Sequence, residues 1–350
     1  MLQRTRRRVK TVLVAGGAGF VGSHLCDALL ARGDRVICVD SYITGSENNV
    51  RPLINHPKFR LIERDVCHID SLDEPLDQIY NLACAASPPQ YQADPVHTMM
   101  TCVAGTGNLL SLAEQHRASL LLASTSEVYG DPVEHPQTEE YRGNVSCTGP
   151  RACYDEGKRA AEALCFDMLR AGKVDARVAR IFNTYGPRMQ PSDGRIISNL
   201  LVQAISGAPL TIYGSGDQTR SFCFVSDLVQ GLMALMDVDP NPGAPVNLGN
   251  PGEFTINQLV DMVLAMVPST SIVVHKPLPE DDPQRRRPDI SRAKDLLGWQ
   301  PTIPLAEGLR LTADWFIAAA RPDGDFDGAQ VTRRSTWRGR AKTGRAAIGI

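Results

Sequence analysis

Short apolar runs of strand length alternate with longer amphipathic segments through the first half of this 350-residue chain. The runs predict buried parallel strands at 12–15, 35–39, 59–63, 78–82, 119–123 and 176–181. Between them, the apolar spacing of helices occurs at 19–32, 95–115 and 152–171. This alternation predicts an α/β fold with a doubly wound, Rossmann-type parallel sheet and helices on both faces.

The first predicted strand and helix are joined by a glycine turn within TVLVAGGAGFVGSHLCDALLARGDRVICVD. Gly16, Gly19 and Gly22 have the spacing that allows a tight turn, close approach to a pyrophosphate and close packing of helix on strand. The helix N-terminus offers N–H groups to phosphates. Asp40 ends the second strand, where a carboxylate binds a ribose diol and repels a 2′-phosphate. The pattern therefore predicts an NAD site and favours NAD over NADP.

The chain changes character after Gly186, where short elements with many Gly and Pro residues follow. We predict an NAD-binding domain at 1–187, with a return segment near 225–250, and a smaller C-terminal substrate-binding lobe at 188–320 that interleaves with it. Residues 321–350 are rich in Gly and Arg and lack periodicity, which predicts a disordered basic tail. Docking of this tail to an acidic partner or a membrane surface is the alternative.

Tyr154 and Lys158 are four residues apart in a predicted helix, so their side chains share one face. A neighbouring cation favours phenolate, which predicts a lowered pKa for Tyr154 and a role as a base. Thr125, at a predicted strand end, is placed to hold the same substrate hydroxyl. The set predicts removal of a proton from an alcohol while a hydride leaves its carbon.

Charge and cysteine content exclude several classes of protein. The chain has 37 Lys and Arg against 39 Asp and Glu, which does not favour a nucleic-acid surface. Its nine cysteines are scattered without a C-x-x-C motif, which predicts reduced thiols in a cytoplasmic protein and no metal site. Cys84 and Cys102 are interpreted as small apolar filler or as lining of the cofactor pocket. No segment approaches the ~20 apolar residues that span a bilayer.

Arginine-bearing loops in the second half predict an anionic substrate. Guanidinium groups suit bidentate recognition of phosphate or carboxylate. Because the chain has no net positive charge, arginines clustered in these loops fit a specific anionic ligand. We infer a diphosphate joined to a sugar acid. The motifs are FNTYGPR (182–188), DGR (193–195), QTRSFCFVSD (218–227) and RRRPD (285–289).

The chain resembles the extended short-chain dehydrogenase/reductase superfamily, and within it the UDP-glucuronate decarboxylases, also called UDP-xylose synthases. The resemblance runs from about Lys10 to Phe316. It rests on ASTSEVYGDP (123–132), GPRACYDEGKRAAE (149–162), RVARIFNTYGPRM (177–189), YGSGDQTRSFCFVSDLV (213–229) and DDPQRRRPDI (281–290). It implies oxidation of UDP-glucuronate at C4 by bound NAD, loss of CO₂, and re-reduction to UDP-xylose. It also implies a homodimer through the helices near 95–115 and 152–171.

Residue roles follow from this resemblance. Tyr154 is the implied acid/base and Lys158 its partner, while Arg220 is expected near the substrate. The strand-end triplet expected to face the sugar is Thr125, Ser126 and Glu127. The implied NAD site comprises Gly16, Gly19, Phe20, Val21, Gly22, Asp40, Asp65, Val66, Leu82, Thr101, Tyr154 and Lys158. The implied substrate site comprises Asn108, Asn183, Arg195, Arg220, Arg285 and Arg287.

Some assignments stay open at this level. Glu127 either orients a water, disfavours the bound carboxylate, or only anchors a loop. Ala85, Met100 and Cys102 depart from the family pattern of Pro, Lys and Asn, and bear on cofactor affinity and catalytic efficiency. The alternatives are a nucleotide-sugar 4-epimerase, a 4,6-dehydratase, or a non-catalytic NAD-binding protein. Ser126 stands where dehydratases carry an acid.

Overall fold

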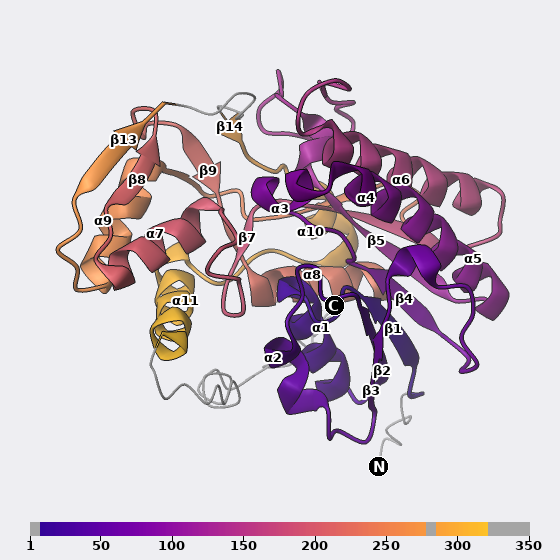
Figure 1. Cartoon of the computed structure of the whole chain (residues 1–350). Helices are drawn as coiled ribbons and strands as arrows, with labels where there is room; N and C mark the ends of the chain where they lie inside the picture. The colour runs from indigo at the N-terminus through magenta and orange to yellow at the C-terminus, as the bar shows by residue number, and fades with distance from the viewer. Residues whose placement is uncertain (1–7, 278–284, 321–350) are drawn as a thin grey trace, which may run out of the picture.

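A seven-stranded parallel sheet forms the centre of the computed structural model, which describes residues 8–277 and 285–320 (Figure 1). Its strand order is β11-β6-β5-β4-β1-β2-β3. The strands are β1 (Thr11–Ala15), β2 (Arg35–Asp40), β3 (Phe59–Glu63), β4 (Gln78–Asn81), β5 (Ser119–Thr125), β6 (Ala176–Ile181) and β11 (Val246–Leu248). The doubly wound fold predicted from the alternating pattern is confirmed.

Helices cover both faces of this sheet because successive strand residues point to opposite sides. In β1, Val12 and Val14 join one hydrophobic core, whereas Leu13 and Ala15 join another. The first core packs against α1 (Phe20–Ala31) and α8 (Val225–Asp237). The second packs against α5 (Thr106–His116) and α6 (Ala152–Arg170). The sheet is thereby buried on both faces, as the continuous apolar strands require.

The helix predicted at 95–115 is interrupted. It consists of α4 (Pro95–Met100), a π-helical segment (Thr101–Gly105) and α5. Gly105 packs so closely that a Cβ there would lie 2.6 Å from Cγ2 of Val66. Single π-helical turns inside α-helices occur frequently at functional sites, and this one carries Cys102.

A smaller group of elements, which we call the C-terminal lobe, lies beside the sheet (Figure 1). It contains α7 (Ile196–Ser206), β8 (Leu210–Tyr213), β9 (Thr219–Ser221), β12 (Glu253–Thr255), α9 (Ile256–Met266), β13 (Val273–Lys276), β14 (Arg285–Arg286) and α11 (Leu305–Ala319). Strand β8 pairs with β13, and β9 lies between β12 and β14. Between β9 and β12 the chain returns to the large sheet through α8 and β11.

Short elements connect these parts. They are α2 (Glu47–Val50), α3 (Pro88–Ala93), β7 (Thr184–Tyr185), β10 (Cys223–Phe224), α10 (Ser291–Leu297) and the 3-10 turns Arg51–Leu53, Val66–His68 and Ser126–Tyr129. None of the helices in the described part of the chain has both the length and the apolar character to cross a membrane. The tail predicted at 321–350 lies outside the described residues.

Candidate active site

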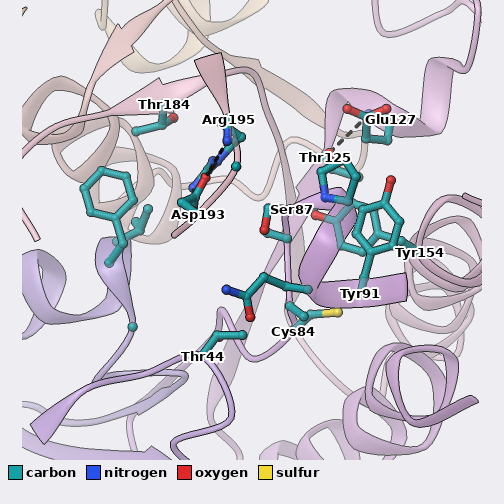
Figure 2. Close-up of a pocket in the computed structure, with 18 of the residues that line it drawn as sticks. Thr44, Cys84, Ser87, Tyr91, Thr125, Glu127, Tyr154, Thr184, Asp193 and Arg195 are labelled. Carbon is teal, nitrogen blue, oxygen red and sulfur yellow. Dashed lines mark hydrogen bonds and ion pairs between the residues drawn. The ribbon is translucent and has the colours of Figure 1, made fainter. Parts of the chain in front are cut away.

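A cavity of about 760 Å³ lies at the carboxyl ends of the central strands and continues to the C-terminal lobe (Figure 2). Ligands of open α/β sheets bind in this position, because the loops after parallel strands meet there. All twelve residues predicted for the NAD site line it, as do Thr125, Ser126, Glu127, Asn183, Arg195 and Arg220.

The glycine turn leaves room for a ligand on one side only. A Cβ at Gly22 would lie 2.0 Å from the carbonyl oxygen of Gly16, so this glycine allows helix α1 to pack on β1. A Cβ at Gly19 would meet only that oxygen, at 3.1 Å, and would otherwise point into open space. No side chain caps α1, and Gly19, Phe20 and Val21 line the cavity at its N-terminus. The turn therefore fits a pyrophosphate.

Asp40 is buried at the end of β2, where the ribose of a dinucleotide is expected. Its carboxylate accepts N–H groups from Ala18 at 2.9 Å and from Tyr42 at 2.8 Å. Burial raises the pKa of Asp40, and these N–H groups offset part of that effect. A Cβ at Gly45 would lie 2.6 Å from the carboxylate, so the loop after β2 is shaped around it. The pocket fits NAD as predicted.

Asp65, which follows β3, also lines the cavity. It accepts the N–H of Cys67 at 2.8 Å and pairs with Nε2 of His97 at 2.7 Å. Burial acts to raise the pKa of Asp65, but the N–H of Cys67 and the imidazole of His97 outweigh it and lower that pKa. Within 8–277 and 285–320, Asp65, Cys67 and His97 are also a group whose ligand atoms lie within 4.8 Å of one another, as a metal site would require. The sequence did not predict this group.

Tyr154 lies in the first turn of α6, with its ring against that of Tyr91 from α3 (Figure 2). The two rings are stacked, with centroids 5.1 Å apart and an interplanar angle of 0°. Thr125 ends β5, and its hydroxyl accepts the N–H of Glu127 at 3.1 Å. Thr125 acts to lower the pKa of Tyr154, against the effect of burial. The structure thus brings the predicted base and the predicted hydroxyl-holding residue together.

The predicted lowering of the Tyr154 pKa is wrong for this structure. Burial raises the pKa of Tyr154 well above its ordinary value, and the neighbouring Cys84 and Cys102 act in the same direction. Lys158 is buried, and its Nζ donates to the carbonyl of Ala123 at 2.9 Å and lies 5.9 Å from the Tyr154 ring centroid. Sequence spacing gives the shared helix face but not the desolvation, which dominates here.

Glu127 is held by two guanidinium groups at the edge of the cavity. Its Oε2 accepts from Nη2 of Arg151 at 2.6 Å, and its Oε1 pairs with Nη1 of Arg286. Burial acts to raise the pKa of Glu127, but Arg286 and Arg151 outweigh it and lower that pKa. The carboxylate is therefore ionised and bridges α6 to the strand β14 of the C-terminal lobe.

The C-terminal side of the cavity carries further cationic groups. Arg195 directly precedes α7 and pairs with Asp193, with Nη2 to Oδ2 at 2.8 Å (Figure 2). Arg220 lies on β9, beside Arg286 of β14 in register, and both line the cavity. Asn183 follows β6 and lines it as well. This charge suits an anionic group, as the arginine loops predicted.

Two of the predicted substrate-binding residues lie elsewhere. Asn108 does not line this cavity, because its amide donates to the carbonyls of Val66 at 3.0 Å and Cys67 at 2.9 Å. Arg287 also lies outside the lining, and its Nη1 pairs with Glu253 at 3.3 Å. The side chain of Arg285 lies outside the described residues.

Cavity residues that the sequence did not single out include Arg286, one of three consecutive arginines among which the contact was left open, Arg151 and Tyr91. Alternation along a strand could have indicated Arg286, because its side chain would face the side opposite to those of residues 285 and 287. Arg151 precedes Tyr154 by three residues, a spacing that places it on the same side of the helix start. Buried Ser87 Oγ, Tyr91 OH and Arg286 Nε lack hydrogen-bond partners among the described residues, which marks polar atoms available to a ligand.

Comparison with known proteins agrees with this geometry. The model of the NAD dependent epimerase/dehydratase family matches residues 12–249. UDP-glucuronic acid decarboxylase 4 of Arabidopsis thaliana is 54% identical over 306 residues, which cover 87% of this chain and 68% of that protein. UDP-glucuronic acid decarboxylase 1 of Danio rerio is 53% identical over 307 residues, which cover 88% of this chain and 72% of that protein.

Solved structures share the fold. The crystal structure of UDP-glucuronic acid 4-epimerase from Bacillus cereus, in complex with UDP-glucuronic acid and NAD, superposes with a TM-score of 0.78 at 26% identity. It covers 87% of this chain, and 98% of that chain is matched. The glycine turn, Asp40 and the matching family model identify NAD as the cofactor. This chain therefore belongs to the NAD dependent epimerase/dehydratase family, in the group of the UDP-glucuronic acid decarboxylases.

Proposed function

We propose that this protein converts UDP-glucuronate to UDP-xylose and CO₂ through a 4-keto intermediate. The observation that carries the proposal is the meeting of Tyr154, Thr125, Glu127 and Arg286 in the cavity that also contains the dinucleotide turn. The identity to UDP-glucuronic acid decarboxylases supports the substrate class. The cationic C-terminal side of the cavity supports a substrate with diphosphate and carboxylate groups.

Tyr154 is the proposed acid/base for the C4 hydroxyl of the sugar. NAD⁺, held by the glycine turn and Asp40, would supply the hydride acceptor and donor for C4 and a positive charge. Thr125 orients the sugar oxygen, and buried Lys158 adds a cation close to the phenol. Burial raises the pKa of Tyr154, and positive charge in the occupied site would favour loss of its proton.

The ionised Glu127 and Arg286 are the proposed partners of the carboxylate end of the sugar. A 4-keto uronic acid is a β-keto acid, so its C–CO₂ bond breaks as the electrons move into the C4 carbonyl. Tyr154 and Thr125 then hold the resulting enolate oxygen. Glu127, kept ionised by Arg286 and Arg151, orients the water that delivers a proton to the ring carbon. Glu127 can also anchor the loop while it orients the water, because its carboxylate pairs with both Arg151 and Arg286.

Product analysis with UDP-glucuronate tests this proposal. We expect purified protein, without added NAD, to release CO₂ and form a UDP-pentose, because we propose that NAD stays bound through the cycle. Acid release and chromatography measure the cofactor content. Turnover that requires added NAD would contradict the proposed tight binding of NAD but not the proposed reaction. A product of unchanged mass would indicate a 4-epimerase and contradict the decarboxylase assignment, and loss of water would indicate a dehydratase.

We also propose a homodimer through α4, the π-helical segment and α6. Exposed apolar side chains support it, since Val96 is 73% and Met100 48% exposed on this side of the molecule. We expect light scattering to give twice the mass of the chain, and Val96→Glu with Met100→Glu to shift the mass towards the monomer. A wild-type monomer at micromolar concentration would contradict the proposal.

A cytoplasmic location is proposed from the cysteines. All nine are free thiols, four of them are half-buried or exposed, and an oxidising compartment would not preserve that state. Fractionation of cells that express the full chain measures the location. Recovery with the membrane or secreted fraction would contradict it.

A further inference from the structure

Two thiols that the proposed chemistry does not use lie next to the catalytic groups. Cys84 follows β4 and lines the cavity, and Cys102 belongs to the π-helical segment. Their sulfur atoms are 3.4 Å apart, and a disulfide bond is about 2.05 Å long, so an approach of roughly 1.4 Å joins them. Both are free in this structure.

The surroundings of this pair favour a thiolate. A hydrogen bond with Cys84 lowers the pKa of Cys102 to about 7, against the effect of burial, and the Lys158 ammonium acts in the same direction. The same pairing raises the pKa of Cys84. A thiolate near neutral pH is the form that reacts with peroxides. Cys102 itself is buried, and a small oxidant reaches the pair past Cys84, which is half-buried at the cavity wall.

Closure of the pair would act on the catalytic helix. Cys102 packs against Gly157, where a Cβ would lie 3.0 Å from the Cys102 Cβ and 3.3 Å from its sulfur. Gly157 directly precedes Lys158 and is one helical turn from Tyr154. A movement of Cys102 towards Cys84 therefore loosens the contact that sets the position of both catalytic side chains.

We propose that Cys84 and Cys102 form a peroxide-sensitive modification site, in which an intramolecular disulfide reversibly switches off the enzyme. The thiolate of one residue attacks a peroxide oxygen, the O–O bond breaks, and the released hydroxide takes up a proton to give water. The resulting sulfenic acid is attacked by the second thiol, the S–S bond forms, and a second water leaves. Two electrons pass from the two thiols to the peroxide.

Peptide mapping of hydrogen-peroxide-treated holoenzyme tests the site. We expect a cross-linked peptide pair that contains Cys84 and Cys102 and has lost two hydrogens. Turnover of UDP-glucuronate should fall on the order of 10²-fold, because displacement of catalytic groups by about 1 Å costs that much. Dithiothreitol should restore it. The activity readout rests on the proposed function, whereas the peptide map does not.

Three variants make the test specific, each compared with its own untreated rate. Cys84→Ala and Cys102→Ala should keep their rates after peroxide, and either one suffices if the other folds poorly. Cys147→Ser, which removes an exposed thiol, should respond like the wild type. Absence of the cross-link, or equal inactivation of Cys102→Ala and wild type, would overturn the proposal. A cross-linked protein that never decarboxylates UDP-glucuronate would support the modification site and contradict the proposed function.

Discussion

Replacement of Tyr154 by Phe is expected to reduce kcat for UDP-glucuronate by about 10²- to 10⁴-fold, the usual contribution of a general acid/base. The ring that stacks on Tyr91 remains, and only the hydroxyl that exchanges the C4 proton is lost. Substrate binding should change little, so kcat and kcat/KM should fall by similar factors. Steady-state kinetics together with calorimetric titration of UDP measures both quantities.

Tyr91→Phe provides the matched control for this variant. Tyr91 stacks on Tyr154 in the same cavity, and its buried hydroxyl has no hydrogen-bond partner among the described residues. We expect its kcat to stay within about tenfold of the wild type, since a general acid/base contributes more than that. If Tyr154→Phe retained as much turnover as Tyr91→Phe, the role assigned to Tyr154 would be refuted.

Replacement of Arg286 by Met is expected to produce the second largest effect. Arg286 pairs with Glu127 and lines the cavity, and its removal leaves the half-buried carboxylate with Arg151 alone. We expect kcat to fall on the order of 10²-fold, as for loss of one preorganised donor in an active site. Because Arg286 helps to lower the pKa of Glu127, that pKa should rise in the variant. The ionised form then appears at higher pH, so the acid limb of the pH–rate profile should move upward.

Arg287→Met is the control on the neighbouring residue. Its guanidinium pairs with Glu253 outside the cavity, so turnover and the acid limb should change little. Thermal unfolding of both variants checks that each is folded. If the Arg287 variant lost activity as strongly as the Arg286 variant, the preference for Arg286 over Arg287 as the substrate contact would be wrong.

Local sequence patterns were sufficient for the cofactor half of the site. Gly16, Gly19 and Gly22 have fixed spacing within one turn, and Asp40 ends the strand that follows, so their relative positions depend on a single βαβ unit. Tyr154 and Lys158 lie on one helix, and the i, i+4 spacing alone places them on one face. The alternating apolar runs likewise determined the parallel sheet, because strands buried on both faces need no long-range information to be recognised.

The substrate-binding half of the site could not be predicted in the same way, because it depends on packing between segments that are distant in the sequence. The choice among three consecutive arginines depends on which face of β14 meets the cavity, and this follows from pairing of β14 with β9. Asn108 was assigned by resemblance, yet its amide satisfies the carbonyls of Val66 and Cys67 instead. Such a partner, 42 residues away, cannot be inferred from spacing along a helix.

The sequence by itself determined the fold class, the NAD site and the shared helix face of Tyr154 and Lys158, because each depends on a pattern that is local in the chain. Only the tertiary structure decided the charge state around them. Burial sets the pKa of Tyr154 above its ordinary value, and two arginines from different elements keep Glu127 ionised. It also brought the sulfur atoms of Cys84, after β4, and Cys102, in the π-helical segment, to 3.4 Å from each other. Desolvation and long-range pairing depend on the complete arrangement of atoms, which no local pattern encodes.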